Sequence, residues 1–448
     1  MKLTYQVNER PKFSKNLLFA FQQLLAIMAA TVLVPILADA TGLYLSQSAA
    51  LIGAGVGTLV YIAFTRMKSP VFLGSSFAFL APLATAVAYG YCGIILGSIF
   101  AGLVYVIIAL VIKFVGTGWI EKLMPPVIIG PTVALIGLSL SGSALKNVMN
   151  TAVLPQNYNL LHILVGVVTF LVTVIASVKG SKGIKMIPFV IGVLAGYALA
   201  TIITLIGWYG FNEAYCNIVD FSGFEKIADL KNWVPNVTFV GAIKEIAGIG
   251  GQSLKLDGAG VVSLLVAFAP VALVVFAEHV ADHKNISSII EKDLLKDPGL
   301  DNTLLGDGVG SIAGAMMGGC PNTTYGESVG CVAITGNASI YTILTTAIMC
   351  IVLAFFYPFI AFIQSIPSCV VGGISIALYG FIAVSGLRMF KNVDLDDSRN
   401  LFVVSAILVP GIGGLTLTFG KISITSIACA LILGILTNAI LKFGKKKS

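Results

Sequence analysis

The sequence predicts an all-α membrane protein with about fourteen transmembrane segments arranged as two related halves. Three observations predict this fold class. The 448 residues are 57% hydrophobic and only 10% charged, with a mean hydropathy of +0.97, whereas soluble domains average about 25% charged residues. Long apolar stretches recur along the whole chain. Three short motifs of the first half also reappear in the second half in the same order.

Most apolar stretches approach the ~20 residues that span a bilayer as a helix. They cover residues 17–38, 48–64, 91–113, 124–141, 160–178, 183–207, 261–281, 338–357, 369–386, 400–419 and 423–441. Three shorter segments, at 70–83, 303–318 and 321–335, are interrupted by Gly, Pro, Ser or Thr, and they bring the total to about fourteen. We expect the first span to be retained, because its apolar run is longer than the core of a signal peptide.

The basic residues indicate the orientation in the membrane. If both termini are cytoplasmic and the segments alternate, 21 of the 27 basic residues lie inside, as the positive-inside rule requires. The net charge of +7 is then spread over short loops, which predicts a cytoplasmic-membrane protein and no nucleic-acid surface. The cysteines show no metal-ligand spacing, so we expect neither a metal site nor a disulfide framework. The six basic residues placed outside are Lys146, Lys226, Lys231, Lys244, Lys255 and Lys421.

Three pairs of similar motifs occur in the same order in the two halves of the sequence. Each half would hold about seven segments, an odd number, so the halves must be inverted relative to each other. Inverted repeats with short, interrupted segments are typical of secondary transporters, whose substrate site lies near the middle of the bilayer. The polar stretch 208–258 joins the halves. The echoes are GVGTL at 55–59 with GVGSI at 308–312, GSSFAF at 74–79 with NTTYGE at 322–327, and Pro125 and Gly130 with Pro367 and Gly372.

The second of these echoes places β-favouring residues where a continuous helix would be expected. Non-helical backbone at membrane depth is tolerated only where it is buried in protein or lines a cavity. We therefore expect two short antiparallel strands, one from each half, with helix N-termini facing a shared pocket. Surface loops are the alternative. Against them, both segments have apolar surroundings and carry no nearby charge except Glu327, which becomes a candidate site residue.

A second polar cluster, AEHVADH at 277–283, ends the apolar run 261–281. Glu278 and Asp282 are four residues apart and share a helix face. Carboxylates in a membrane segment mark a functional site by default, and two that repel each other suit a group that takes up and releases a proton. A helix end that emerges into water is the alternative. This alternative predicts that His283 is exposed to water, and it allows His279 to be either buried or exposed. Asp307 is either a third buried acid or part of a helix cap or loop.

An enzyme is not predicted. The histidines at 162, 279 and 283 have no H-E-x-x-H spacing, and no nucleophile is paired with a base. The pattern GDGVG at 306–310 lacks the strand–turn–helix context of nucleotide binding, so it indicates close packing of helices through small residues.

Several longer motifs are specific to one family. They lie at residues 22–35, 73–79, 116–119, 277–280, 292–300 and 321–327. With them the sequence resembles the nucleobase/ascorbate transporter family, also called nucleobase:cation symporter-2, and within it the bacterial uracil permeases. The resemblance runs along essentially the whole chain.

The resemblance implies fourteen segments as a 7+7 inverted repeat, divided into a core domain and a gate domain. The core domain would comprise residues 1–115 and 259–357, and the gate domain residues 116–207 and 358–448, with the cytoplasmic tail at the end. Residues 208–258 would form an extracellular connection. It also implies proton-coupled import of a nucleobase by alternating access, a possible homodimer through the gate domain, and no cofactor.

The family pattern also assigns roles at the site. Glu278 would accept a ring N–H of the base, with Glu327 as the second acid. The backbone amides of Phe77, Gly326 and Glu327 would donate to the base carbonyls. The full set implied for substrate binding is Glu278, Glu327, Phe77, Gly326, Tyr325, Ser76 and Tyr379, and the set implied for proton coupling is Asp282, Glu327 and His279.

The chain departs from the family at the site. Asp282 stands where uracil permeases have a histidine, and His283 follows one position later on another helix face. Gln23 stands in place of a histidine, and Ser328 in place of an asparagine. Glu327 favours a pyrimidine, because purine members have glutamine at this position. A purine permease of the same family stays an alternative, and an anion transporter of the same fold is a weaker one, since two acids disfavour an anionic substrate.

Overall fold

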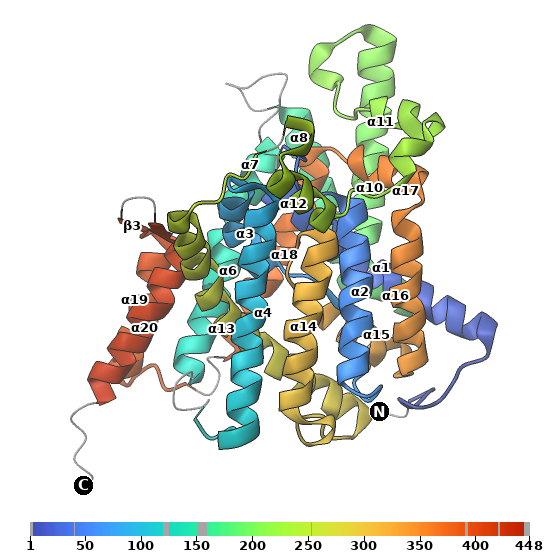
Figure 1. Cartoon of the computed structure of the whole chain (residues 1–448). Helices are drawn as coiled ribbons and strands as arrows, with labels where there is room; N and C mark the ends of the chain where they lie inside the picture. The colour runs from blue at the N-terminus through green and yellow to red at the C-terminus, as the bar shows by residue number, and fades with distance from the viewer. Residues whose placement is uncertain are drawn as a thin grey trace.

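The computed structural model describes residues 3–39, 41–119, 125–149, 159–251, 253–389, 393–419 and 422–442. Within these ranges, eight spans are long and apolar enough to cross a membrane. The chain is therefore a mostly helical, multi-pass membrane protein, as predicted (Figure 1). These spans are α1 (Phe13–Ala38), α2 (Gln47–Phe64), α4 (Gly90–Val115), α6 with α7 (Pro126–Ser139, Ser141–Met149), α8 (Leu160–Lys179), α10 with the π-helical turn η2 (Pro188–Ile203, Thr204–Gly210), α13 (Gly258–Ile290) and α18 (Ser368–Arg388).

Two further helices, α16 (Ile340–Ala354) and α17 (Tyr357–Gln364), are long and apolar enough only when taken together, and they are bent by 80° at the break between them, as in a broken span or a re-entrant loop. The other described helices are α3 (Leu80–Val87), α9 (Lys182–Met186), α11 (Ser222–Glu225), α12 (Thr238–Ala247), α14 (Leu300–Gly318), α15 (Gly326–Thr335), α19 (Ser398–Ile412) and α20 (Ser426–Lys442). Short turns of helix are η1 (Phe77–Phe79), η3 (Ala214–Cys216), η4 (Lys226–Ala228), η5 (Leu230–Trp233), η6 (Ile249–Gly251) and η7 (Leu295–Gly299). The described strands are β1 (Leu73–Ser75), β2 (Asn322–Thr324), β3 (Leu417–Phe419) and β4 (Ile422–Ile424).

Two predicted segments differ from the structure. Residues 303–318 were expected to be an interrupted piece, but they belong to the continuous helix α14. Residues 400–419 were expected to be one span, but α19 ends at Ile412 and β3 follows. Gly414 has a φ of +74°, a conformation that glycine adopts without strain and that stops a helix. Lys421 and the segments 120–124 and 150–158 of the predicted gate domain lie outside the described residues.

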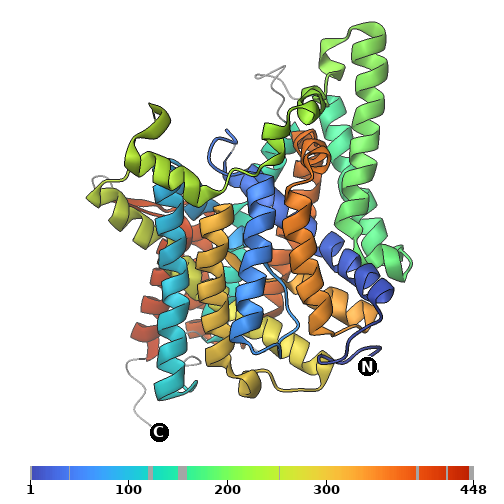
Figure 2. The same ribbon diagram turned by 45° about the vertical axis from the view of Figure 1, so that its right-hand side comes forward.

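The outer faces of the helices are apolar. Only 33% of the α8 span and 22% of the Pro188–Gly210 span are buried inside the protein. Leu164, Leu171, Ile175 and Ile202 are exposed there, on a group of helices that stands along one side of the bundle (Figure 2). Contiguous apolar surface of this size is unfavourable in water, and bilayer hydrocarbon covers it.

Helix α14 packs closely between α2 and α4, and the three stand side by side in Figure 1. Glycines make this approach possible: a Cβ at Gly53 would lie 2.5 Å from the carbonyl oxygen of Gly314. A Cβ at Gly308 would lie 2.7 Å from the carbonyl oxygen of Gly102. The interpretation of residues 306–310 as packing glycines is therefore confirmed.

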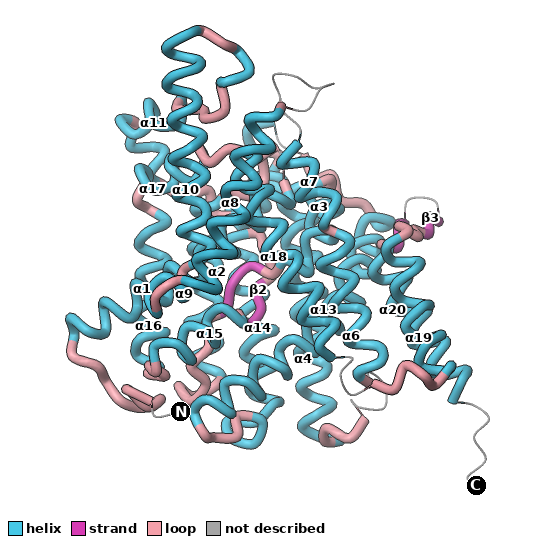
Figure 3. The backbone as a smooth tube through the Cα atoms, turned by 180° about the vertical axis from the view of Figure 1, so that it is seen from behind, coloured by secondary structure: helices cyan, strands magenta, loops and turns pink. Residues whose placement is uncertain are grey.

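A second group of helices is built around α18 and α6. A Cβ at Gly137 would lie 2.3 Å from the carbonyl oxygen of Tyr379, and one at Gly386 would lie 2.2 Å from the amide of Ala134. The same small-residue packing therefore holds this group together. The helix α20 ends on the same side of the bundle as the N-terminal residues (Figures 1 and 3).

Strands β1 and β2 lie in the middle of the bundle, surrounded by helices (Figure 3). They pair antiparallel, with Gly74 opposite Thr323, and all six residues are buried. The hydroxyl of Thr58 on α2 bonds both backbone groups of Leu73, at 2.9 and 3.0 Å. The two interrupted motifs thus satisfy each other's backbone, and α15 and η1 begin directly after them.

The three sequence echoes fall in corresponding elements. The motifs at 55–59 and 308–312 lie in α2 and α14, which pack against each other. The motifs at 74–79 and 322–327 form the paired strands and the helical turns after them. Pro125 and Pro367 precede α6 and α18 in the same extended conformation, with φ/ψ of −67°/162° and −70°/153°. Each motif of the first half therefore lies in an element that contacts the element holding its partner motif from the second half.

We predict that Gly74→Ala destabilises the strand pair. A Cβ at this position would lie 2.4 Å from the ring of Tyr325, closer than any side chain tolerates. Overpacking of this kind costs about 1–3 kcal/mol, because the ring or the strand must shift. The thermal unfolding midpoint of the purified protein should therefore fall. Gly380→Ala on α18 is the matched control, since no atom lies within 4 Å of its Cβ position. Equal midpoints for the two variants would contradict the prediction.

Candidate substrate site

A cavity of about 660 Å³ lies beside the strand pair. Its walls come from α1, β1, η1, β2, α13, α15, α6, α10 and α18, with the strands, α13 and α15 facing α6, α10 and α18. This volume is within the range of about 300–1,000 Å³ that is usual for small-molecule sites. The residues predicted for the site that line this cavity are Ser76, Phe77, Glu278, Asp282, Tyr325, Gly326 and Glu327.

Three carboxylates face this cavity. Glu278 and Asp282 project from one face of α13, as their spacing predicts, and Glu327 lies in the first turn of α15. All three side chains are half-buried. The hydroxyl of Thr324 at the end of β2 donates a hydrogen bond of 2.9 Å to Asp282 Oδ2. The strand pair therefore positions one acid directly. Glu327 interacts with its own backbone amide, and a carboxylate has enough lone pairs for both Glu278 and Glu327 to accept from a ligand.

The N-terminus of α15 supplies donors to the same cavity. Tyr325 precedes the helix in an extended conformation, and no side chain caps its first turn. The amides of Gly326 and Glu327 are therefore among the N–H groups that a helix leaves without an internal partner. Gly326 is exposed to the cavity, and the nearest atom to its Cβ position is Asp282 Oδ1 at 3.6 Å. Amide donors and carboxylate acceptors thus stand beside each other.

The turn after β1 contributes a second helix start. The amide of Ser76 donates to the carbonyl oxygen of Pro321 at 3.1 Å, and η1 begins at Phe77 without a side-chain cap. The Phe77 ring lies edge-to-face against the ring of Tyr379 on α18, with centroids 6.0 Å apart. Tyr379 is buried and does not line the cavity, so it packs against Phe77 from the opposite wall.

Tyr325 lines the cavity, but its hydroxyl is directed into the strand pair. It donates to the carbonyl oxygen of Ser75 at 2.8 Å and lies 3.3 Å from the hydroxyl of Thr31. Only 4% of the residue is exposed. Tyr325 therefore fixes the start of α15 relative to β1, and offers little ring surface to a ligand.

His279 lies away from the cavity, on the other face of α13. Its Nδ1 is 2.7 Å from Asp307 Oδ2 on α14, its Nε2 is 3.1 Å from the hydroxyl of Thr303, and all of these side chains are buried. Asp307 is therefore the third buried acid that the sequence left open. A buried polar group needs a hydrogen-bond partner, so this contact ties α13 to α14 behind the site.

The expectation that His283 emerges into water is wrong. Its side chain is fully buried, with Nε2 2.7 Å from the hydroxyl of Tyr61 on α2 and Nδ1–H donating to the carbonyl oxygen of His279 at 2.8 Å. The two imidazole rings stack with centroids 4.1 Å apart. Two causes explain the error: α13 continues to Ile290, about two and a half turns farther than the apolar run, and α2 covers this face.

Two of the departures from the family pattern contact each other. The side-chain amide of Gln23 on α1 donates to the hydroxyl oxygen of Ser328 on α15, and both residues are buried. The same hydroxyl oxygen accepts from the amide of Phe72 at 3.1 Å. Gln23 and Ser328 therefore form one hydrogen-bonded unit that holds the first turn of α15 against α1 and β1.

Sequence reasoning missed several cavity residues. Asn285 follows Glu278 by seven residues, and this spacing on a helix face could have identified it. Phe189 and Phe381 form an edge-to-face pair in the wall opposite the acids, at 6.0 Å. Arg388 lines the cavity at the end of α18, but the sequence shows it only as a basic residue beside a membrane span.

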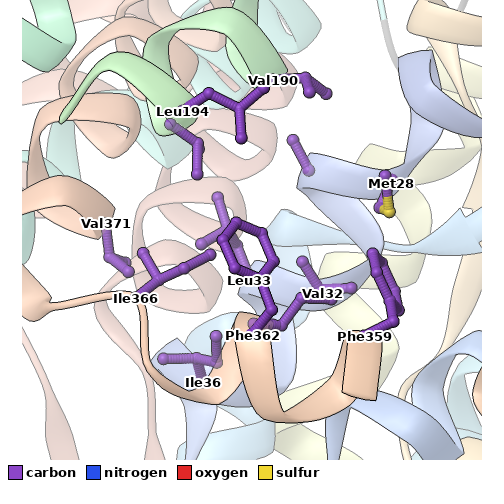
Figure 4. Close-up of a pocket in the computed structure, with 13 residues that line it drawn as sticks. Met28, Val32, Leu33, Ile36, Val190, Leu194, Phe359, Phe362, Ile366 and Val371 are labelled. Atoms are coloured by element: carbon purple, nitrogen blue, oxygen red, sulfur yellow. The ribbon is translucent and has the colours of Figure 1, made fainter. Parts of the chain in front are cut away.

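A second cavity, of about 60 Å³, lies between α1, α10, α17 and the start of α18. Thirteen apolar side chains line it, among them Met28, Leu33, Leu194 and Phe362 (Figure 4). It is about a tenth of the volume of the first cavity and offers no side-chain polar group to a ligand. The polar cavity beside the strands is therefore the candidate substrate site.

The helical bundle and this cavity define a class: an integral membrane permease with a candidate substrate cavity at paired, interrupted segments. Solved structures share the fold. The transmembrane domain of the cyanobacterial bicarbonate transporter BicA matches with a TM-score of 0.61 and 13% identity, covering 97% of this chain and 100% of that one. SLC26A9 matches with a TM-score of 0.62 and 12% identity, covering 96% and 66%.

The family is identified by its own model. The model described as the Permease family matches residues 14–420, and the chain belongs to this family, the nucleobase/ascorbate transporters. The uracil permease of Bacillus caldolyticus is 37% identical over 98% of this chain and 95% of its own length. The uracil permease of Bacillus subtilis is 35% identical over 96% and 93%, and that of Escherichia coli K12 is 33% identical over 97% and 93%.

Proposed function

We propose that this chain is a proton-coupled symporter that imports uracil across the cytoplasmic membrane by alternating access. The observation that carries the proposal is that Glu278 and Glu327 line one cavity together with the start of α15, whose first amides have no partner within the helix. Uracil has two N–H donors and two C=O acceptors, so carboxylates and amides complement it fully in a site that excludes water. The uracil permeases among the relatives support the same substrate.

In the proposed site, Glu278 accepts a ring N–H and Glu327 is the second acid. The amides of Phe77, Gly326 and Glu327 donate to the carbonyl oxygens of the base. The Phe77 ring provides an apolar face, and Tyr379 packs edge-to-face against it. Ser76 and Tyr325 position these groups through their bonds to Pro321 and Ser75.

The proposed architecture has fourteen segments as a 7+7 inverted repeat, with both termini cytoplasmic. The equivalent positions of α2 and α14, β1 and β2, and α6 and α18 support two related halves. Residues 1–115 and 259–357 would form the core domain that carries the site, and residues 116–207 and 358–448 the gate domain. Residues 208–258 would lie outside. A homodimer through the gate domain is part of this proposal.

The chain is proposed to work without catalysis and without a cofactor, with the proton as the coupling ion. Among the described residues, no three His, Cys, Asp or Glu side chains are grouped so that they could hold a metal ion. An anionic substrate of the kind named for the bicarbonate transporter would meet three acids in this cavity, which disfavours it. A purine base is larger, and Glu327 disfavours it on the family pattern.

The test is uptake into proteoliposomes that contain the purified protein. We expect labelled uracil to accumulate when an inward proton gradient is imposed, and to equilibrate without accumulation when it is absent. Xanthine, adenine and bicarbonate should not accumulate, and an imposed sodium gradient should not replace the proton gradient. Accumulation of xanthine in place of uracil would identify a purine permease, and accumulation driven only by sodium would overturn the coupling ion.

A further inference from the structure

The face of α18 that lines the cavity changes in character along the helix. Leu378, Phe381 and Ile382 are apolar, and they are followed by Ser385 and then Arg388, the last residue of the helix. Their spacing of three to four residues keeps them on one face. Arg388 is exposed, and within the described part of the chain it forms no ion pair. Arginine is always charged, so an uncompensated cation stands at this end of the cavity.

The opposing helix α13 presents a polar face to the same cavity. Glu278, Asp282 and Asn285 line it at spacings of four and three residues. The contact between Phe77 and Tyr379 joins the η1 wall to the α18 wall. Arg388 lies nine residues beyond Tyr379, which is about 13 Å along α18. Arg388 therefore stands at the mouth, on the side of Asp282 and Asn285 that is away from the Phe77 contact.

The charges around the cavity are unbalanced. The charged groups that line it are Glu278 and Asp282 from α13, Glu327 from α15 and Arg388 from α18, while the lining residues of β1, η1, β2, α6 and α10 carry no charge. Asp282 is the acid farthest along α13 toward the mouth. An arginine–carboxylate pair is weak in water and much stronger where water is excluded. Closing the mouth would therefore favour contact between Arg388 and Asp282.

We propose that Arg388 is the movable counter-charge of the cavity, and that its guanidinium pairs with Asp282 to hold the mouth closed. This Arg388–Asp282 latch rests on the proposed alternating-access function and states how one of its states is held. Protonation of Asp282 removes the negative charge and releases the latch. On the proposed topology the mouth faces the cytoplasm, so the same acid that carries the proton also controls access to the inside.

The test measures access to the mouth directly. Asn285→Cys introduces a thiol there, in a Cys92→Ser background, because Cys92 is the one cysteine that is not buried. Inside-out vesicles are labelled with a membrane-impermeant maleimide. We expect Arg388→Gln to raise the labelling rate about tenfold, which corresponds to about 1.4 kcal/mol. Arg388→Lys should give a smaller rise, because it keeps the charge but loses the bidentate geometry.

Two comparisons make the outcome decisive. Arg399→Gln is the control, since Arg399 is an exposed arginine that pairs with Asp397 outside the cavity. In an Asp282→Asn background, Arg388→Gln should have no further effect, because partners of one contact are not additive. Labelling of Arg388→Gln at the unsubstituted rate, or a full additional effect on top of Asp282→Asn, would overturn the latch. Uracil uptake by the unsubstituted protein in the same vesicles reports separately on the proposed function.

Discussion

Glu278→Gln weakens uracil binding by about 10- to 100-fold, because a charged acceptor contributes about 1.5–3 kcal/mol to a desolvated hydrogen bond. The amide that replaces the carboxylate has the same size, but it carries no charge and has only one acceptor oxygen. Its NH₂ group cannot accept a hydrogen bond from the ring N–H of the base. Glu278 accepts no described hydrogen bond from the protein, so the change should leave the fold intact. The measurement is the dissociation constant for uracil by isothermal titration calorimetry on purified protein.

Glu327→Gln should weaken binding by a similar factor, since Glu327 faces the same cavity from the first turn of α15. Glu213→Gln, an exposed glutamate of the long connection, is the matched control and should bind like the unsubstituted protein. Unchanged affinity in both Glu278→Gln and Glu327→Gln, with the thermal unfolding midpoint preserved, would show that the acids of this cavity do not recognise the base.

The parts of the fold that could be predicted from the sequence are the segments whose structure depends on their own length and residue types, and not on distant neighbours. Long apolar stretches form helices because a bilayer permits little else, and the interrupted motif around Ser75 forms a strand because its residues disfavour helix there. The helix α14 could not be predicted as continuous. Its glycines disfavour a helix in isolation, but close backbone contacts of α2 with Gly314 and of α4 with Gly308 stabilise the helix. A single sequence does not show which helices will be those neighbours.

The same distinction holds at the site. The spacing of Glu278 and Asp282 places both on one helix face, and both line the cavity. The burial of His283 could not be predicted, because it depends on Tyr61, which is more than two hundred residues away along the chain. Arg388 is the clearest case. Its charge suggested only topology, and its place at the cavity follows from how α18 packs on α6.

The acidic residues fall into two groups: those that line the cavity and one that is buried behind it. Asp282 stands on the cavity side of β2 and is held by Thr324, whereas Asp307 is paired with His279 behind it. A proton carrier must exchange with water in at least one state, so a group that lines the cavity suits this role better than a fully buried pair. Among the predicted carriers, this argument favours Asp282 and Glu327 over His279.

Asp282→Asn should keep uracil binding and exchange but abolish accumulation driven by a proton gradient. The asparagine carbonyl can still accept from the hydroxyl of Thr324, so the local structure is retained. The lost carboxylate is the group proposed to carry the proton. One proton moved with a neutral base contributes about 2.3 kcal/mol per 100 mV, which corresponds to an accumulation of about 50-fold.

Two assays in the same proteoliposomes separate these outcomes. Exchange of labelled for unlabelled uracil needs no net proton movement and should proceed in Asp282→Asn, whereas uptake under an inward proton gradient should stop at equilibrium. Asp396→Asn, at an exposed loop carboxylate, is the matched control and should accumulate uracil normally. If Asp282→Asn still concentrates uracil, while Glu327→Gln or His279→Gln exchanges it without accumulation, the proton is carried by that other residue. Since Asp282 stands where the family pattern has a histidine, normal accumulation by Asp282→His would show that either residue type can carry the proton at this position.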